Sequence, residues 1–272
     1  PHGLRAYQSL DENQGYPETR MPATMFPCAS AMSSTFSPSL LQEVGQVIAD
    51  ECNHYGIDII LGPGVNGKRS PLGGRNFEYY SEDPFLTAEC ATAFVKGVQS
   101  RGVGTSLKHF ILNEQEHSRR YADSRVDART FRELYAYPFE QVVKRAHPTT
   151  IMSSYNRVGG HYASENPFLL ETLLREQWGY DGIVISDWGA VQDKAKSVSA
   201  SLDIEMPESE WKDASLRMLS LESTMKRKST KRFSVFYPSM NDCLRTRIME
   251  KQRTSQETIS LRKKWRNVRW FC

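Results

Sequence analysis

The chain has 272 residues, of which 39% are hydrophobic and 25% are charged, and its formal net charge is +3. This length is enough for one large barrel or two ordinary domains with a sizeable core. No apolar run approaches the roughly 18 residues that a membrane-spanning helix needs, and the five cysteines, odd in number and without CxxC spacing, argue against a disulfide framework or a zinc site.

The first predicted helix covers residues 39–55, after a polar stretch that contains Gly15 and Pro17. Ser37 is the expected N-cap, and Pro38 fits the first helical position. Apolar side chains recur at helical spacing along this helix, namely Leu40, Leu41, Val44, Val47, Ile48 and Cys52. We expect this face of the helix to be buried against a sheet.

Strands and helices alternate along the rest of the first 207 residues. The predicted strands are residues 57–61, 103–107, 149–152, 183–185 and 202–206. The predicted helices are residues 85–101, a helix that Asp127 caps, and one that runs from Asn166 and Pro167 to Trp178. This alternation is typical of a parallel α/β sheet. The loop between the first strand and the next helix, residues 62–84, is long and rich in turn residues, which favours a functional role.

Polar side chains follow three of the predicted strands. Lys108 and His109 end one strand, Tyr155 follows another, and Asp187 follows the apolar run 183–185. Because the carboxyl ends of parallel strands meet at one edge, and that edge carries the active site of α/β barrels, these side chains are expected to converge there. Taken singly, each has an ordinary structural alternative: a solvated lysine, a core histidine, a packing tyrosine, and an aspartate that caps the next helix.

The chemistry of this set favours a neutral, polyhydroxylated ligand. The sequence has no Gly-rich phosphate loop that opens a helix, no HExxH and no GxSxG. What remains is a carboxylate, an aromatic neighbour and several hydrogen-bonding side chains, which are Arg75, Lys108, His109, Arg119 and Tyr155. A sugar offers hydroxyl groups to such donors and acceptors, and its apolar ring faces stack on aromatic side chains.

Four sequence segments together resemble a known family. They are GRNFEYYSEDP at residues 74–84, KHF at 108–110, MSSYNRVGG at 152–160 and SDWGAV at 186–191. In their order and spacing they are similar to the N-terminal barrel domain of glycoside hydrolase family 3, the β-glucosidase family. The resemblance covers residues 1–207 and implies a (β/α)8 TIM-like barrel, expected here to be incomplete, without its first strand.

The family resemblance implies a retaining β-glucosidase in carbohydrate metabolism, which removes terminal β-D-glucosyl residues through a covalent glycosyl-enzyme. Asp187 matches the nucleophile. Sugar-binding or site-lining positions of the family match Arg5, Arg75, Lys108, His109, Arg119, Met152, Tyr155 and Trp188. Neither a cofactor nor a metal is implied. Arg5 lies in the family's DGPHGLR block, and the chain begins at the proline of that block, after the aspartate that holds the sugar.

The resemblance leaves the second catalytic carboxyl group unassigned. In this family the acid/base residue usually comes from a second domain that follows the barrel, and no segment here resembles that domain. The carboxylates Glu78, Glu82, Glu114 and Glu116 are expected to orient other residues or to bind solvent. We expect weak or no activity from this chain alone, because the sugar-holding aspartate and the acid/base residue are missing. We also expect poor solubility and little stability, since an incomplete barrel exposes sheet edges and apolar surface.

The composition changes after residue 207. All 17 glycines lie at or before Gly189, and residues 212–272 carry 16 Lys and Arg against 5 Asp and Glu, a net of +11, which leaves −8 for residues 1–211. Residues 208–272 are thus predicted to be a basic tail of low order, and the hypothesis is that the reading frame shifts near Pro207. The rival interpretation is a genuine basic extension that binds nucleic acid or an anionic surface.

The expected partners follow from these interpretations. We expect a β-glucoside or oligosaccharide substrate, with no nucleic acid and no membrane. The alternative to an enzyme is a non-catalytic sugar-binding or basic interaction protein. Because no signal-peptide pattern is visible at the start, and unpaired cysteines fit a reducing compartment, the expected location is cytoplasmic.

Overall fold

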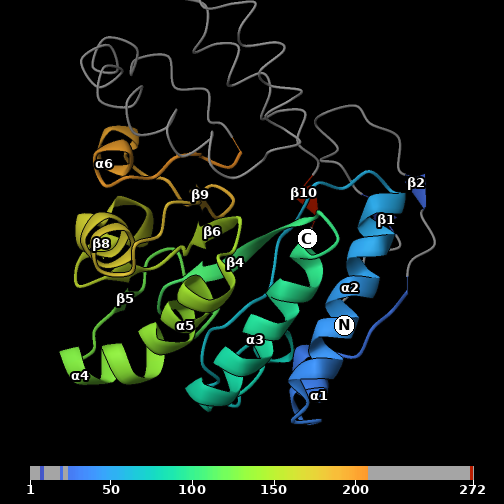
Figure 1. Cartoon of the computed structure of the whole chain (residues 1–272). Coiled ribbons are helices and arrows are strands. Elements are labelled where there is room, and N and C mark those ends of the chain that lie inside the picture. Colours follow the sequence, from blue (N-terminus) through green and yellow to red (C-terminus); the bar gives the residue numbers. More distant parts are fainter. Residues whose placement is uncertain (1–6, 9–18, 21–23, 208–269, 272) are drawn as a thin grey trace, which may run out of the picture.

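The computed structural model describes residues 7–8, 19–20, 24–207 and 270–271 (Figure 1). Arg5 lies outside the described residues. So does the predicted basic tail, 208–272, apart from the two residues of one short strand, and the hypotheses about that tail therefore remain predictions.

A parallel sheet forms the centre of the described structure (Figure 1). Its strands lie in the order β10–β3–β4–β6–β9, and every adjacent pair is parallel. Their bounds are Trp270–Phe271 (β10), Ile59–Ile60 (β3), Gly104–Phe110 (β4), Thr150–Ser153 (β6) and Ile183–Ser186 (β9). The predicted parallel α/β arrangement is confirmed. The last predicted strand, 202–206, is a single parallel bridge of Ile204 to Ile185.

Strand β4 is longer than predicted. Lys108 and His109 lie inside it, where the pairing with β6 shifts in register between Leu107 and Phe110. The prediction that these two residues follow the strand was therefore wrong by a few positions. All seven residues of β4 are buried, including Lys108 and His109. A polar residue therefore does not by itself mark the end of a buried strand.

The long helices cover one side of this sheet, where α2, α3 and α5 lie side by side (Figure 1). The main helical segments are α2 (Pro38–His54), α3 (Pro84–Gln99), α4 (Ala128–Thr130) continued by η3 (Phe131–Ala136) and α5 (Tyr137–Ala146), η5 (Phe168–Gln177) and α6 (Lys194–Ser199). The segments η3 and η5 are π-helical, which the helical spacing did not predict.

The structure also contains several shorter helices and strands. They are α1 (Ala29–Ser33), η2 (Asn76–Glu78), η4 (Ala163–Glu165), the hairpin-like pair β1 (Tyr7–Gln8) and β2 (Thr19–Arg20), and a second small sheet of β5 (Asp123–Ser124), β7 (Arg157–Val158) and β8 (His161–Tyr162).

The predicted helix caps are confirmed. Ser37 accepts a hydrogen bond from the Leu40 N–H, and Asp127 accepts from the second and third residues after it. Each cap satisfies backbone donors that have no partner within the first helical turn. These caps fix where the long helices begin, and so which residues join each helix to its strand.

The buried face of α2 differs from the prediction. Leu40 and Val47 are 41% and 47% exposed, whereas Leu41 and Ile48 are fully buried. The reason is that α2 packs mainly on α3, and of its fully buried side chains only Ile48, Ala49 and Cys52 share a core cluster with Ile60 of β3. A helix that docks on another helix buries a narrower stripe than one that lies flat on a sheet.

A second apolar cluster lines the sheet. Leu61, Met152, Ile183 and Ile185 form it, with Ile204 and Met206 packed against them. Leu107 and Ile151 of the sheet belong to a third and larger cluster, which they share with the helices, so the apolar side chains of the sheet fall into three clusters. This agrees with a barrel whose strands face helices outside and a packed core inside.

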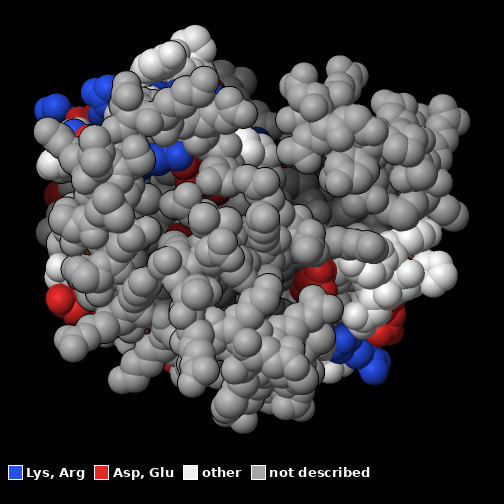
Figure 2. Space-filling model, turned by 90° about the horizontal axis from the view of Figure 1, so that it is seen from above, with Lys and Arg blue, Asp and Glu red and all other residues white. Residues whose placement is uncertain are grey.

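Seen from above, described basic side chains lie beside described acidic ones (Figure 2). Among the described residues, no helix has the length and apolar character needed to cross a membrane.

Candidate active site

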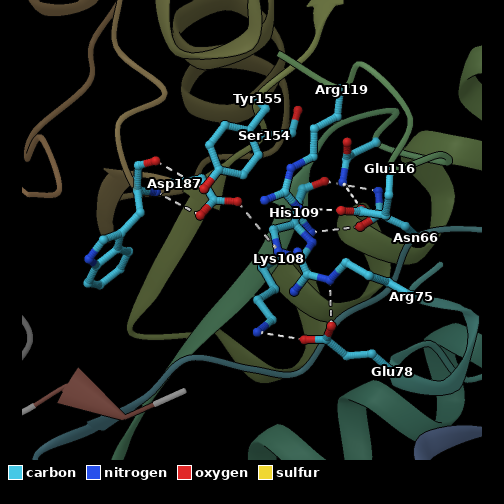
Figure 3. A network of polar contacts seen from close by, with 12 residues as sticks. Asn66, Arg75, Glu78, Lys108, His109, Glu116, Arg119, Ser154, Tyr155 and Asp187 are labelled. Atoms are coloured by element: carbon cyan, nitrogen blue, oxygen red, sulfur yellow. Dashed lines mark hydrogen bonds and ion pairs between the residues drawn. The ribbon is translucent and has the colours of Figure 1, made fainter. Parts of the chain in front are cut away.

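The polar side chains at the carboxyl ends of the central strands lie together (Figure 3). Residues Phe110, Ser153 and Ser186 are aligned across β4, β6 and β9, so the three strands end at one edge. His109 Nε2 lies 3.6 Å from Asp187 Oδ2, and the Tyr155 hydroxyl donates to the carbonyl oxygen next to Asp187, at 3.0 Å. The structure thus places these residues at one edge of the sheet, as expected.

Asp187 is 7% exposed, and the two oxygens of its carboxyl group differ in their hydrogen bonding. Its Oδ1 accepts the Trp188 N–H at 2.7 Å, whereas Oδ2 is buried and accepts no hydrogen bond from the described residues. Burial raises the pKa of this carboxyl, although the Trp188 N–H, the Tyr155 hydroxyl, Arg75 and Lys108 favour the carboxylate. The helix-cap alternative is excluded, because Asp193 caps the following helix α6.

His109 is a buried, neutral imidazole. Burial lowers its pKa well below the ordinary value, and the nearby Arg75 and Lys108 lower it further. The imidazole of His109 therefore interacts with the Asp187 carboxylate as a neutral dipole and does not form an ion pair with it. The Tyr79 hydroxyl hydrogen-bonds His109 Nδ1 at 3.2 Å, which orients the ring so that Nε2 faces Asp187.

The Asn66 side chain holds the backbone of His109. Its Oδ1 accepts the His109 N–H at 2.8 Å, and its Nδ2 donates to the His109 carbonyl at 3.0 Å. Glu114 Oε1 accepts from the same Nδ2 at 3.4 Å, and burial raises the pKa of Glu114 to about 8. The amide therefore replaces the ladder partners that β4 loses at its register shift.

Glu78 joins two cations at the site (Figure 3). Its Oε2 lies 2.7 Å from Arg75 Nε, and its Oε1 lies 2.7 Å from Lys108 Nζ. Burial alone would raise the pKa of Glu78, but Lys108 and Arg75 lower it far below its usual range. The Lys108 side chain is only 7% exposed, so the solvated-lysine alternative is wrong.

Backbone bridges explain how the long loop 62–84 reaches this edge. Gly64 pairs in parallel with both Tyr79 and Lys108. The loop is therefore attached to β4 beside the residues that meet Asp187, and η2 within it presents Glu78. The prediction that this long loop has a role at the site agrees with its placement.

Tyr155 lies between two guanidinium groups and Asp187. The Cζ atoms of Arg119 and Arg120 are 4.2 and 5.2 Å from the centre of its ring. Burial and the negative charge of Asp187 raise the pKa of Tyr155 to about 12, so the side chain remains a hydrogen-bond donor at neutral pH. Arg119 is in turn held by an ion pair with Glu116.

The remaining predicted residues divide into exposed and packed ones. Trp188 is 38% exposed, whereas Met152 is 2% exposed and belongs to the apolar cluster with Leu61, Ile183 and Ile185. Of the four additional carboxylates, Glu78, Glu114 and Glu116 orient other side chains, and Glu82 is exposed to solvent; both placements agree with the expectation. Asn66, Tyr79 and Arg120 were missed, because a loop residue that holds a neighbour's backbone or ring has no spacing pattern of its own.

This arrangement can hold a neutral polyol and attack it. Donors surround a carboxylate whose Oδ2 has no hydrogen-bond partner among the described residues, and the adjacent residue Trp188 is 38% exposed. Within the part of the chain that the structure describes, no group of three or more His, Cys, Asp or Glu side chains is placed to hold a metal ion. Nucleophilic attack by a carboxylate, supported by hydrogen bonds, is a reaction that these side chains offer.

Comparison with known proteins gives consistent matches. The family model described as "Glycosyl hydrolase family 3 N terminal domain" matches residues 1–217. An exo-α-(1→6)-L-arabinopyranosidase of Bifidobacterium longum is 50% identical over 209 residues, which is 77% of this chain and 28% of the relative. The thermostable β-glucosidase B of Acetivibrio thermocellus is 49% identical over 209 residues, with the same coverage of 77% and 28%.

Solved structures agree in fold. The β-glucosidase 3B of Thermotoga neapolitana, in complex with α-D-glucose, has a TM-score of 0.69 at 40% identity, over 83% of this chain and 31% of that chain. A β-glucosidase of Kluyveromyces marxianus, in complex with glucose, has a TM-score of 0.73 at 34% identity, over 83% and 30%. These likenesses confirm the predicted TIM-like barrel class. The chain spans less than a third of the length of these proteins.

Proposed function

The chain belongs to glycosyl hydrolase family 3, and from this premise we propose that it supplies the nucleophile of a retaining β-glucosidase, with residues 1–207 as part of the barrel domain. The observation that carries the proposal is the buried Oδ2 of Asp187, which has no hydrogen-bond partner among the described residues although donors surround it. The β-glucosidases among its relatives support the same reaction class.

In the proposed reaction Asp187 Oδ2 attacks the anomeric carbon, and the bond from that carbon to the leaving oxygen breaks as the oxygen takes a proton. Water then attacks the same carbon and loses a proton, and the bond to Asp187 breaks. The two inversions together retain the anomeric configuration. Arg75, Lys108, His109, Arg119 and Tyr155 bind the sugar hydroxyls in this proposal, Trp188 stacks on the ring, and Met152 lines the site.

The second carboxyl group of the reaction is proposed to come from outside the described residues. Glu78 is unsuited to it, because Lys108 and Arg75 keep it ionised and a general acid must carry a proton. Glu114 holds a proton more readily, but its carboxyl is hydrogen-bonded to the amide that clamps His109. Arg5, a further sugar-binding position of the proposal, also lies outside the described residues.

Trapping of the covalent intermediate tests this function. Incubation of the full-length protein with an activated 2-deoxy-2-fluoro-β-glucoside should add one fluoroglucosyl mass, because this reagent forms the ester without needing an acid for its good leaving group. Intact-mass spectrometry measures the adduct, and peptide mapping should place it on Asp187. A folded protein that binds glucose but forms no adduct would favour the non-catalytic sugar-binding alternative.

A second substrate class is favoured by one observation. The relatives at 50% identity are named exo-α-(1→6)-L-arabinopyranosidases, and the β-glucosidase at 49% is no closer. Comparing kcat/KM for aryl β-D-glucoside and aryl α-L-arabinopyranoside therefore decides which terminal sugar the site prefers. Both reactions would use the same nucleophile, so trapping at Asp187 is expected in either case.

The pH dependence of the activity is predicted from Asp187. Only the carboxylate attacks, so kcat/KM should fall as the pH drops through the pKa of this residue in the free enzyme. Because burial raises that pKa, the acid limb should lie above the pH of about 3.9 expected for an exposed aspartate. Rates on an activated aryl glycoside measure the limb, and assays at pH 7 after incubation at each pH separate it from unfolding. Full activity down to pH 3.9 would contradict the assignment.

A further inference from the structure

Glu78 stands apart from the residues assigned to sugar or to bond breaking. Its two oxygens are occupied by Arg75 and Lys108, at 2.7 Å each, and its side chain is 16% exposed. It lies at the end of η2, and Arg75 is the residue that precedes this short helix. A carboxylate so enclosed by two cations is neither a nucleophile nor an acid.

We propose that Glu78 is a positioning residue, which fixes Arg75 and Lys108 toward the sugar and balances their charge beside Asp187. The inference rests on the proposed function, since it assigns to Glu78 a part in that same site. It goes beyond the sugar-binding positions because Glu78 acts only through its two partners.

The positioning part follows from geometry. The Arg75–Glu78 pair closes one helical turn of the loop, and Lys108 belongs to β4, so the two cations come from different elements. Gly64 is paired with both Tyr79 and Lys108, which fixes the loop against the strand by backbone contacts. Glu78 engages Arg75 through Nε only, and Lys108 through one of three ammonium donors, so each cation keeps donors for a ligand.

The charge-balancing part follows from the neighbours of Asp187. Arg75 and Lys108 from the loop and β4 favour its ionised form, as do the Tyr155 hydroxyl and the Trp188 N–H. The other charged or titratable groups near the triad are His109, Tyr79, Glu116, Glu114 and Arg119. With Glu78 ionised, the triad of Glu78, Arg75 and Lys108 carries a net charge of +1, and without that charge it carries +2. Glu78 therefore limits how strongly the two cations favour the Asp187 carboxylate.

The substitution Glu78→Gln tests both parts in the full-length protein. It keeps the shape of the side chain and removes its charge, so the acid limb of kcat/KM should move to lower pH by about half to one unit. KM should rise about tenfold, because the charge-assisted bonds that hold both cations weaken. Glu133→Gln is the matched control, since Glu133 is exposed in an ion pair with Arg129 on the helical surface, and it should change neither quantity.

Charge restoration keeps the test decisive. Lys108→Met lowers the triad charge to 0 and should move the acid limb to higher pH, whereas Glu78→Gln with Lys108→Met restores +1 and should return it close to the wild-type position. The double variant also avoids an excess buried charge if Glu78→Gln alone does not fold.

Three outcomes would overturn the inference. An active wild type whose Glu78 variants share its acid limb overturns this inference alone. If neither Glu78→Gln nor the double variant folds, the role of Glu78 is purely structural. A folded wild type that forms no adduct with the activated 2-deoxy-2-fluoro-β-glucoside would overturn the proposed function, and this inference with it.

Discussion

Replacement of Asp187 by alanine should lower kcat for an aryl β-glucoside by at least about a thousandfold in the full-length protein, because the group that forms the covalent bond is lost. The side chain is 7% exposed and its Oδ2 accepts no hydrogen bond from the described residues, so little structure depends on that oxygen. Affinity for glucose, measured by calorimetry, should change far less than kcat, since the surrounding donors remain.

The same variant offers a positive test. Removal of the carboxyl leaves space beside the anomeric carbon, and added azide should restore turnover of an activated β-glucoside to an α-glucosyl azide, since a single displacement inverts the configuration. Nuclear magnetic resonance of the product reads the configuration directly. Asp181→Ala is the matched control, because Asp181 is exposed just before β9, and it should retain wild-type kcat. Wild-type turnover by Asp187→Ala would exclude Asp187 as the nucleophile.

The sequence predicts the framework of this site well because its local signals are strong. Apolar runs set strands β6 and β9, and Tyr155 and Asp187, which follow them, lie at one edge of the sheet as parallel pairing requires. Asp187 contacts His109, and Tyr155 hydrogen-bonds the backbone of Trp188. Which residues of a run end up buried depends on the partner element, and for that reason Leu40 and Val47 are exposed on α2 although they share its apolar periodicity.

The support of the site is harder to predict than its centre. Asn66 and Tyr79 act on His109 across more than 25 positions of sequence, through one backbone clamp and one ring hydrogen bond. Such contacts depend on how the loop 62–84 folds back on β4, and this is fixed by the isolated bridges at Gly64. Residue type and spacing carry no signal for them. The π-helical turns of η3 and η5 are equally invisible, because the apolar period over a few turns does not distinguish i→i+4 from i→i+5 bonding.

Gly97→Ala should destabilise the protein by about 2 kcal/mol or more, although alanine is the better helix former by roughly 1 kcal/mol. Gly97 lies in α3 where it crosses α2, and a Cβ atom there would lie 2.1 Å from the Gln42 carbonyl oxygen and 3.0 Å from its carbonyl carbon. These are backbone atoms of α2, so no side-chain rotation relieves the overlap. Gly45 makes the reciprocal approach, since its Cβ would lie 2.6 Å from the Phe94 carbonyl oxygen.

The sign of the change in the free energy of unfolding distinguishes helix propensity from steric overlap. If helix propensity dominated, the free energy of unfolding would rise in Gly97→Ala, and a rise measured by urea denaturation would mean that the two helices do not approach as closely as described. Lys96→Ala, at the exposed neighbouring position, is the control and should stay within about 0.5 kcal/mol of wild type. Because α3 leads directly into β4, which carries Lys108 and His109, helix separation in Gly97→Ala should also lower kcat/KM. A loss of stability and activity together would connect the α2–α3 crossing to the placement of the site.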